Sequence, residues 1–257
     1  MTAWENQQEA IQIALDEIHQ RIQEVVKLSR GDLSGYERDL AGMLGGTWDI
    51  CRDETKLFLS TAEYLYNMTD PRADFSGAMI EYCKALEVEL NSRILDRLIP
   101  YIVTNVPKGY VAAGRHKVGP KHLTRLTLGA FPYLLARSWT SELTGRQYSN
   151  PQYDEDFTRF FFDLQYRRSF RYENSEDHRS SLATTIQTIA DHRNRAAHTR
   201  GVAKSEVASI RQDWCFHGRI QDLLRDLETL EEFRESPEGK LLRAIFGDEA
   251  ATAHNME

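Results

Sequence analysis

The chain has 257 residues, of which 41% are hydrophobic and 28% charged, and its formal net charge is −7. This length can bury a substantial core, and the composition is ordinary for a soluble globular protein. No apolar run approaches the roughly twenty residues of a membrane span, and the polar, acidic start is unlike a signal peptide. Three scattered cysteines do not suit a disulfide framework or a zinc cluster, so we expect reduced, buried thiols in a cytoplasmic protein without a membrane partner.

Apolar residues recur at helical spacing through most of the first hundred residues. A hydrophobic seam over residues 4–25 predicts a first helix of about three heptads. A second predicted helix runs from Trp48 to Met68, and a third from Asp74 to Leu98, where Pro100 is expected to close it.

The middle of the chain alternates between predicted loops and helices. Residues 106–120 are rich in Gly, Lys and Arg and are expected to form an exposed loop. Residues 123–139 predict a helix, 144–153 a loop, and 157–170 a helix with an aromatic face.

The last third predicts further helices. One begins at Ser180 or Ser181, a good N-cap, and ends after His198, since Gly201 supplies a C-cap. Another runs from Val207 to Leu230, and a short one over residues 240–246 lies in a frayed tail.

These patterns together predict an all-α protein. We expect an N-terminal helical extension over residues 1–73, a helical bundle over 74–235 and a tail over 236–257.

Positive charge is concentrated in one part of this acidic chain. No Asp or Glu occurs between Arg97 and Thr140, and the rest of the chain holds 25 basic against 39 acidic residues. The seven positive residues of this span are Arg97, Lys108, Arg115, Lys117, Lys121, Arg125 and Arg137. Such a span favours a phosphate-rich partner, although a basic loop that pairs with an acidic neighbour would have the same composition.

An arginine interrupts an apolar helical stripe in the last third of the chain. At about 100° per residue, Arg193 falls at the centre of the stripe that contains Ile186 and Ile189. An unpaired buried charge costs several kcal/mol, so this arginine must meet an anion, a partner subunit or a wet cleft. Asn194 and His198 lie one turn apart on the adjoining face, which gathers three polar groups at one helix end.

Arginine, amide and imidazole together suit RNA cleavage without a metal. Histidine titrates near neutrality and can take the proton of a 2′-hydroxyl group. Arginine carries a fixed charge and a fork of donors that can stabilise the charge developing on the phosphorus. No HExxH motif occurs, and the stretch GYVAAGRH lacks the Lys-Ser/Thr pair of a phosphate-binding loop, so we expect neither a metal nor another cofactor.

The sequence RNRAAH, from Arg193 to His198, resembles the signature of the HEPN superfamily. That signature is an arginine, commonly followed by Asn, and then a histidine after four to six intervening residues. The stretches EYCKALEVEL, from Glu81, and TLGAFPYLL, from Thr127, also look like the helical scaffold of that family, so the resemblance covers about residues 74–231.

The resemblance implies a helical bundle that forms a homodimer, with two copies of the motif facing each other in a cleft on the twofold axis. Many HEPN proteins are metal-independent endoribonucleases that leave a 2′,3′-cyclic phosphate and serve as toxins or in antiviral defence. On this chain, His198 would be the general base or acid, Arg193 would hold the phosphate, and Asn194 would orient one of them.

Further basic residues are expected to bind the RNA phosphates around the motif: Arg195, Arg200, Lys117, Lys121 and Arg125. An antitoxin or a sensor protein is a further expected partner.

Two alternatives remain open from the sequence. Arg193 could pair with a buried carboxylate such as Glu87, while His198 caps its helix. The protein would then be a non-catalytic helical module that regulates or scaffolds a partner. It could also be an enzyme that an antitoxin or its own N-terminal helices hold inactive.

Overall fold

The computed structural model describes residues 17, 20, 33–68, 70, 72–153, 156–157, 159–160, 176–198, 201–216, 219–227 and 240. Most of the predicted first helix, most of the aromatic helix and nearly all of the tail lie outside these residues. The described residues form a mostly helical fold, as predicted, with two short hairpins that the sequence did not predict.

The helices occupy the following ranges: α2 Leu33–Leu44, α3 Gly46–Ile50, α4 Asp53–Met68, α5 Ser76–Leu90, the π-helical η1 Asn91–Leu95, α6 Asp96–Asn105, the 3-10 helix η2 Leu128–Ala130, α7 Phe131–Leu135, α10 Glu176–His198, α11 Lys204–Cys215 and α12 Arg219–Asp226. The strands are β1 Val111–Ala113, β2 His116–Val118, β3 Ser138–Thr140 and β4 Gln147–Ser149. Strands β1 and β2 form one antiparallel hairpin, and β3 and β4 form another.

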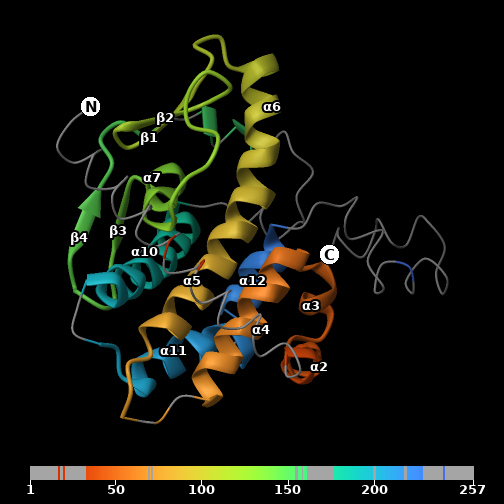
Figure 1. The fold of residues 1–257 in the computed structure, drawn as a ribbon. Helices are drawn as coiled ribbons and strands as arrows, with labels where there is room; N and C mark the ends of the chain where they lie inside the picture. The colour runs from red at the N-terminus through yellow and green to blue at the C-terminus, as the bar shows by residue number, and fades with distance from the viewer. Residues whose placement is uncertain are drawn as a thin grey trace.

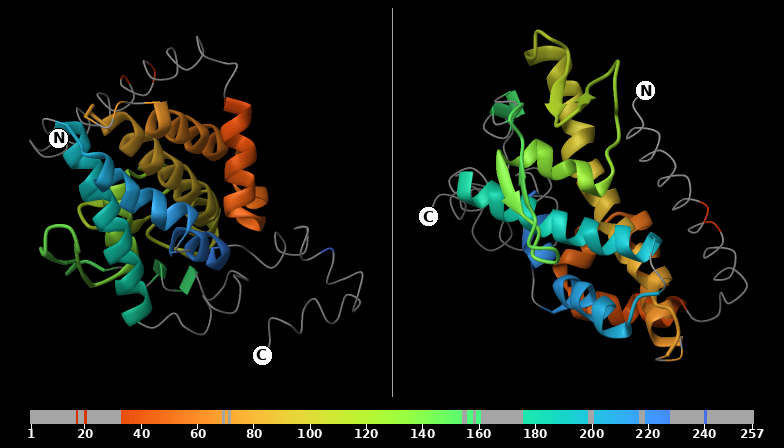
Figure 2. Two further views of the ribbon diagram at one scale, coloured as in Figure 1. Left: turned by 90° about the horizontal axis from the view of Figure 1, so that it is seen from below. Right: turned by 90° about the vertical axis from the view of Figure 1, so that its left-hand side faces the viewer.

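Helix α5 lies at the centre of the fold. It packs against α4, α10 and α11, while α2 packs against α4 (Figure 1, Figure 2). The apolar face of α5 that contains Met79, Cys83 and Leu86 is buried, and most of the other residues of α5 are buried as well. A helix covered on all sides has to place its charged residues inside the protein, and α5 carries Glu87 and Glu89 there.

Helices α4 and α5 share one hydrophobic core. Leu59 and Ala62 of α4 are fully buried and belong to the same cluster as Met79 and Leu86 of α5. The boundary between residues 73 and 74 stays a prediction, and this core is continuous across it.

The prediction that Pro100 closes the helix was wrong. Helix α5 continues through η1 into α6, which ends only at Asn105 (Figure 1). Proline removes one backbone donor and crowds the preceding turn, but a helix can continue past it where the hydrogen-bond ladder adjusts. The π-helical turn directly before α6 loosens that same ladder.

The single helix predicted over residues 123–139 was also wrong. The structure has only η2 and α7 there, and Ala136 is already extended after α7. The predicted loops over 106–120 and 144–153 contain β1, β2 and β4. Strands of three residues are too short to show the alternation that predicts a strand.

Other helix boundaries differ from the prediction as well. The helix predicted over 48–68 divides into α3 and α4 at Cys51, whose backbone is extended, and the last predicted helix divides into α11 and α12. Helix α10 begins at Glu176, so Ser180 is not its N-cap; its hydroxyl instead donates to the carbonyl oxygen of Ser138.

The β3–β4 hairpin is attached to α10 by hydroxyl and amide side chains. The backbone N–H groups of Thr140 and Glu142 donate to the hydroxyl oxygens of Thr184 (3.2 Å) and Thr188 (2.9 Å). The indole N–H of Trp139 donates to Gln187 Oε1 at 3.3 Å. Polar residues spaced along one face of α10 therefore bind the edge of β3, and Figure 1 shows the hairpin beside that helix.

The three cysteines are free and buried, as predicted. Burial raises the pKa of Cys51, Cys83 and Cys215 to about 12, so all three thiols stay protonated at neutral pH. In the described helices, no stretch combines the length and the apolar character needed to cross a bilayer.

A buried carboxylate joins α4, α5 and α11. Arg211 Nε lies 2.7 Å from Glu63 Oε1, and the Tyr82 hydroxyl donates to the same oxygen at 2.5 Å. We expect Arg211→Met to lower the free energy of unfolding by about 3–5 kcal/mol, because Glu63 loses its counter-charge in the core. Urea unfolding of the full chain measures this change.

The control for this variant is Arg225→Met, whose partner Asp222 lies at 3.8 Å on the surface. We expect that change to stay below about 1 kcal/mol. A second substitution, Glu63→Gln, should recover much of the loss in the Arg211→Met background. Equal stability of Arg211→Met and wild type would show that the pair does not hold these helices together.

Candidate functional site

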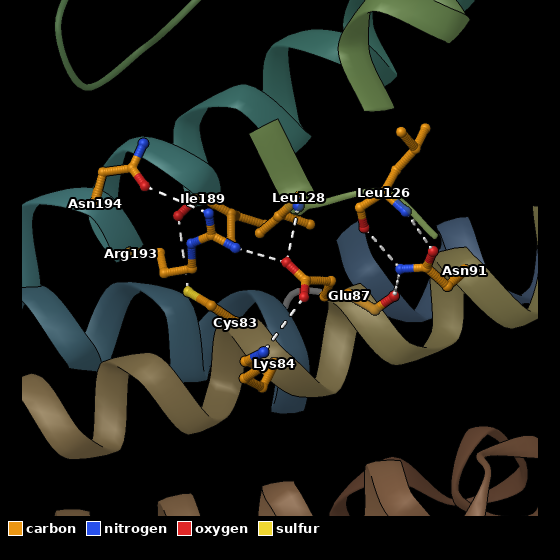
Figure 3. Close-up of polar contacts among 9 residues, drawn as sticks. All are labelled: Cys83, Lys84, Glu87, Asn91, Leu126, Leu128, Ile189, Arg193 and Asn194. Carbon is orange, nitrogen blue, oxygen red and sulfur yellow. Dashed lines mark hydrogen bonds and ion pairs between the residues drawn. The ribbon is translucent and has the colours of Figure 1, made fainter. Parts of the chain in front are cut away.

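Arg193 is buried within its own chain. Its side chain is 2% exposed, and its Nη1 lies 2.6 Å from Glu87 Oε2 on α5 (Figure 3). The sequence predicts that the charge of Arg193 falls in the apolar stripe of α10. In the structure, the carboxylate of Glu87 lies opposite this charge. The pairing with Glu87 that the sequence left open as an alternative is the arrangement observed.

Glu87 has two further partners. Lys84 Nζ lies 3.5 Å from its Oε1, and the backbone N–H of Leu128 donates to its Oε2 at 2.9 Å (Figure 3). One carboxylate thus connects α5, α10 and the start of η2. Because both carboxylate oxygens and the Arg193 charge have partners, these contacts offset much of the free-energy cost of burying the pair.

Asn91, one turn after Glu87, anchors the same segment. Its side-chain amide donates to the carbonyl oxygen of Leu126 at 2.9 Å and accepts from the Leu126 N–H at 2.9 Å (Figure 3). The backbone over residues 126–128 is therefore held by two side chains of the central helix. This segment leads directly into the wall of a pocket.

A pocket of about 640 Å³ lies between α10, the two hairpins and the η2–α7 segment. Gln187, Asp191, Arg193 and Asn194 form its α10 wall. The opposite walls come from the β1–β2 turn, from Thr127 to Tyr133, and from residues 146–152. Two of the three residues of the predicted motif thus belong to one concave site.

The pocket is basic within an acidic chain. Arg115 in the β1–β2 turn and Arg146 before β4 line it together with Arg193, and Asp191 is its acidic residue. His116 of β2 also lines it. Glu87 lies behind Arg193 and compensates part of this charge, but the lining still carries an excess of positive groups, which favours an anionic ligand.

Asn194 is half-buried in the pocket wall beside Arg193. Its Oδ1 faces Arg193 Nη2 at 3.5 Å, a long contact (Figure 3). An amide whose oxygen faces the guanidinium directs its NH₂ group away from it, where that group can donate to a ligand.

His198 lies at the exposed C-terminal end of α10 and is not part of the pocket lining. The chain that follows His198 is held by Asp74. The Oδ1 atom of Asp74 accepts from the Val202 N–H at 3.0 Å and from the Ser76 N–H at 2.8 Å. Gly201 makes this turn with φ 107°, a conformation that favours glycine. These contacts hold the end of α10, which carries the motif, against the start of α5.

The other predicted RNA-binding residues that the structure describes lie in several segments of the chain and are not part of the pocket lining. Arg195 is paired with Glu206 of α11 at 3.1 Å, and Lys117 lies over the ring of Tyr110 at 4.5 Å. Arg125 is exposed and paired with Asp96 at 2.6 Å. Lys121 is exposed in the loop after β2, and Arg200 lies outside the described residues.

A second pocket, of about 370 Å³, lies on the other side of Glu87. Arg125, Asp96, Lys84 and Glu87 are among its lining residues, so acidic and basic groups are mixed there. Its charge gives no preference for an anion, in contrast to the pocket beside Asn194.

Sequence reasoning did not predict a site role for several lining residues: His116, Tyr133, Arg146, Tyr148 and Asp191. It counted Arg115 in the basic span and met the Arg-His pair in a failed match to a phosphate-binding loop, whereas in the structure the pair lies at the turn of a hairpin. Within the described part of the chain, no group of three His, Cys, Asp or Glu side chains is placed to hold a metal ion.

The Arg193–Glu87 pair predicts a stability cost. We expect Arg193→Ala to lower the free energy of unfolding by about 3–5 kcal/mol, because Glu87 stays in the core without its main counter-charge. Chemical denaturation followed by circular dichroism measures the loss. The matched control is Arg195→Ala on the exposed face of the same helix, where we expect a change under about 1 kcal/mol.

The double variant Glu87→Gln/Arg193→Met distinguishes two contributions to the loss of stability, the unpaired charge on Glu87 and the lost packing of the Arg193 side chain. It should be more stable than Arg193→Ala, because no unpaired charge remains in the core. If Arg193→Ala instead unfolds like wild type, the pair is not a structural anchor.

Comparisons with protein-family models, with curated proteins and with solved structures found no match to this chain. The resemblance to the HEPN superfamily therefore rests on RNRAAH and its helical context.

Proposed function

We propose that the protein is a HEPN-type endoribonuclease that binds RNA at the pocket beside Asn194 and cleaves it without a metal. It would act in the cytoplasm as a toxin or in antiviral defence, controlled by an antitoxin or a sensor protein. As the resemblance implies, it would work as a homodimer with two motifs facing each other across a twofold axis.

One observation supports this proposal above the others. Arg193 and Asn194, two parts of the motif, lie in the wall of a concave pocket whose charged lining is mainly positive, although the whole chain carries −7. RNA offers a dense row of negative phosphates, and a basic cleft in an acidic protein steers such a polymer to one place.

In this proposal the 2′-hydroxyl oxygen attacks the adjacent phosphorus, and the bond from phosphorus to the 5′-oxygen breaks. The products are a 2′,3′-cyclic phosphate and a 5′-hydroxyl end. His198 accepts the 2′-hydroxyl proton, and an acid returns a proton to the leaving 5′-oxygen. In a homodimer, the second copy of His198 could supply that acid.

The structure changes the role proposed for Arg193. Its charge is already matched by Glu87 at 2.6 Å, so it is a weaker clamp for a phosphate than a free arginine would be. We assign it a positioning role: it holds the α10 wall against α5 and lies beside the amide of Asn194. Asn194 then donates to the phosphate or to the imidazole.

One observation favours a second candidate, a non-catalytic helical module that scaffolds a partner. Arg193 is fully buried in an intrachain pair, and His198 lies outside the pocket lining. Such a protein would need the motif for its fold and would leave RNA intact.

The test is a cleavage assay on total RNA in EDTA. Wild type should release fragments with cyclic phosphate ends, and His198→Ala should cut at least about 100-fold more slowly, because general acid–base catalysis is lost. His198 is exposed, so its replacement should change the free energy of unfolding by less than about 0.5 kcal/mol. Robust cutting by His198→Ala would refute the assignment.

Asn194→Ala is the companion variant, and it is preferable to Arg193→Ala, whose loss of activity would be confounded by unfolding. The absence of products from well-folded wild type on every RNA tried would favour the scaffold. To test inhibition by the N-terminal segment, the deletion has to stop before Leu33, because Leu40 and Leu44 of α2 belong to the core together with α4.

A further inference from the structure

The pocket beside Asn194 has features that a simple phosphate site would not need. We propose that it binds a nucleoside phosphate, with the phosphate at the arginines and the base against Asp191 and the aromatic wall. The proposal rests on the proposed function only for the source of the ligand, an RNA strand, and a free nucleotide has the same chemistry.

The size of the pocket suits such a ligand. Its volume of about 640 Å³ lies in the range of pockets that enclose small molecules and cofactors. It combines charged, amide and aromatic side chains from four separate segments of the chain. A site assembled in this way can contact several parts of one ligand at once.

The arginines account for the negative part of the ligand. Arg115 and Arg146 come from two different hairpins and line the same pocket. Arg193 lies in its α10 wall. Arginine offers a fork of donors that suits phosphate oxygens. Both hairpin arginines are exposed residues of the pocket lining.

Asp191 indicates that the ligand is more than an anion. Its Oδ1 accepts from Gln187 Nε2 at 3.0 Å, while its buried Oδ2 has no hydrogen-bond partner among the described residues. A carboxylate repels inorganic phosphate but accepts from an N–H group, and nucleobases carry such groups on their edges.

The aromatic wall completes the site. Tyr148 of β4 lies parallel to Trp139 of β3, with ring centroids 5.7 Å apart, and Tyr133 meets Trp139 edge-on at 4.8 Å. Arg146 Cζ lies 5.1 Å from the Tyr148 ring. Tyr133 and Tyr148 line the pocket, and aromatic rings of this kind are surfaces on which bases stack.

Isothermal titration of the full chain with the four 5′-mononucleotides and with inorganic phosphate tests the proposal. At least one nucleotide should bind ten-fold or more tightly than phosphate. The double variant Arg115→Ala/Arg146→Ala should weaken that binding at least ten-fold. Asp191→Asn should reduce the ratio between the affinity for the nucleotide and the affinity for phosphate. The matched control Arg72→Ala removes an exposed arginine whose partner is Asp70, outside this pocket, and should bind like wild type.

A short 2′-O-methyl RNA, which lacks the attacking hydroxyl, separates the two sources of the ligand. Tighter binding of this RNA than of mononucleotides identifies a strand, and the reverse identifies a free nucleotide. Equal binding of phosphate and nucleotides, or unchanged binding by the Arg115→Ala/Arg146→Ala variant when it melts like wild type, overturns the proposal. Nucleotide binding without any RNA cleavage would support this inference and contradict the proposed nuclease activity. RNA cleavage together with unaltered nucleotide binding by the pocket variants would support the nuclease and contradict this inference.

Discussion

The buried ion pair between Glu87 and Arg193 is the interaction on which the rest of the structure depends. It joins the central helix α5 to the motif helix α10, and the same carboxylate accepts from the Leu128 N–H. Two walls of the basic pocket are therefore fixed relative to each other by one side chain. A buried charge pair tolerates little displacement, because each partner is costly to leave alone in a low dielectric. The pair thus fixes the rear wall of the site, while the exposed arginines of its lining, Arg115 and Arg146, belong to the hairpins.

The same device recurs through the core. Glu63 pairs with Arg211, and Glu89 pairs with Arg93 at 2.7 Å while accepting from the backbone N–H of Arg52 at 2.8 Å. The first pair joins α4 to α11. The second lies within one turn of the α5–η1 helix and binds the segment between α3 and α4 through the Arg52 N–H and the Ile50 carbonyl oxygen. Apolar side chains tolerate sliding by a turn, whereas a hydrogen-bonded charge pair satisfies one alignment only. The chain thus uses buried carboxylates on α4 and α5 to specify which helices meet and in what register.

Sequence reasoning recovered the helical class, the buried cysteines and the unusual position of Arg193, and it named Glu87 as a possible partner. All of these follow from periodicity within one segment or from the cost of an unpaired charge. It missed the hairpins, because strands of three residues carry too short a pattern. It missed the passage of α6 beyond Pro100, because the π-helical turn has no sequence signature. Arg115, Arg146 and Asp191 meet only through tertiary packing, so local patterns could not assemble the pocket.

The attachment of β3 to α10 has a consequence for association between molecules. An exposed strand edge presents backbone groups that can pair with a strand of another chain, which is a route to aggregation. At the end of β3 and just after it, threonine hydroxyls of α10 already accept from the backbone N–H groups of Thr140 and Glu142. The hairpin can therefore be short and near the surface without pairing with a strand of another molecule. Replacing those threonines by valine would leave these backbone N–H groups unpaired and would favour association between molecules.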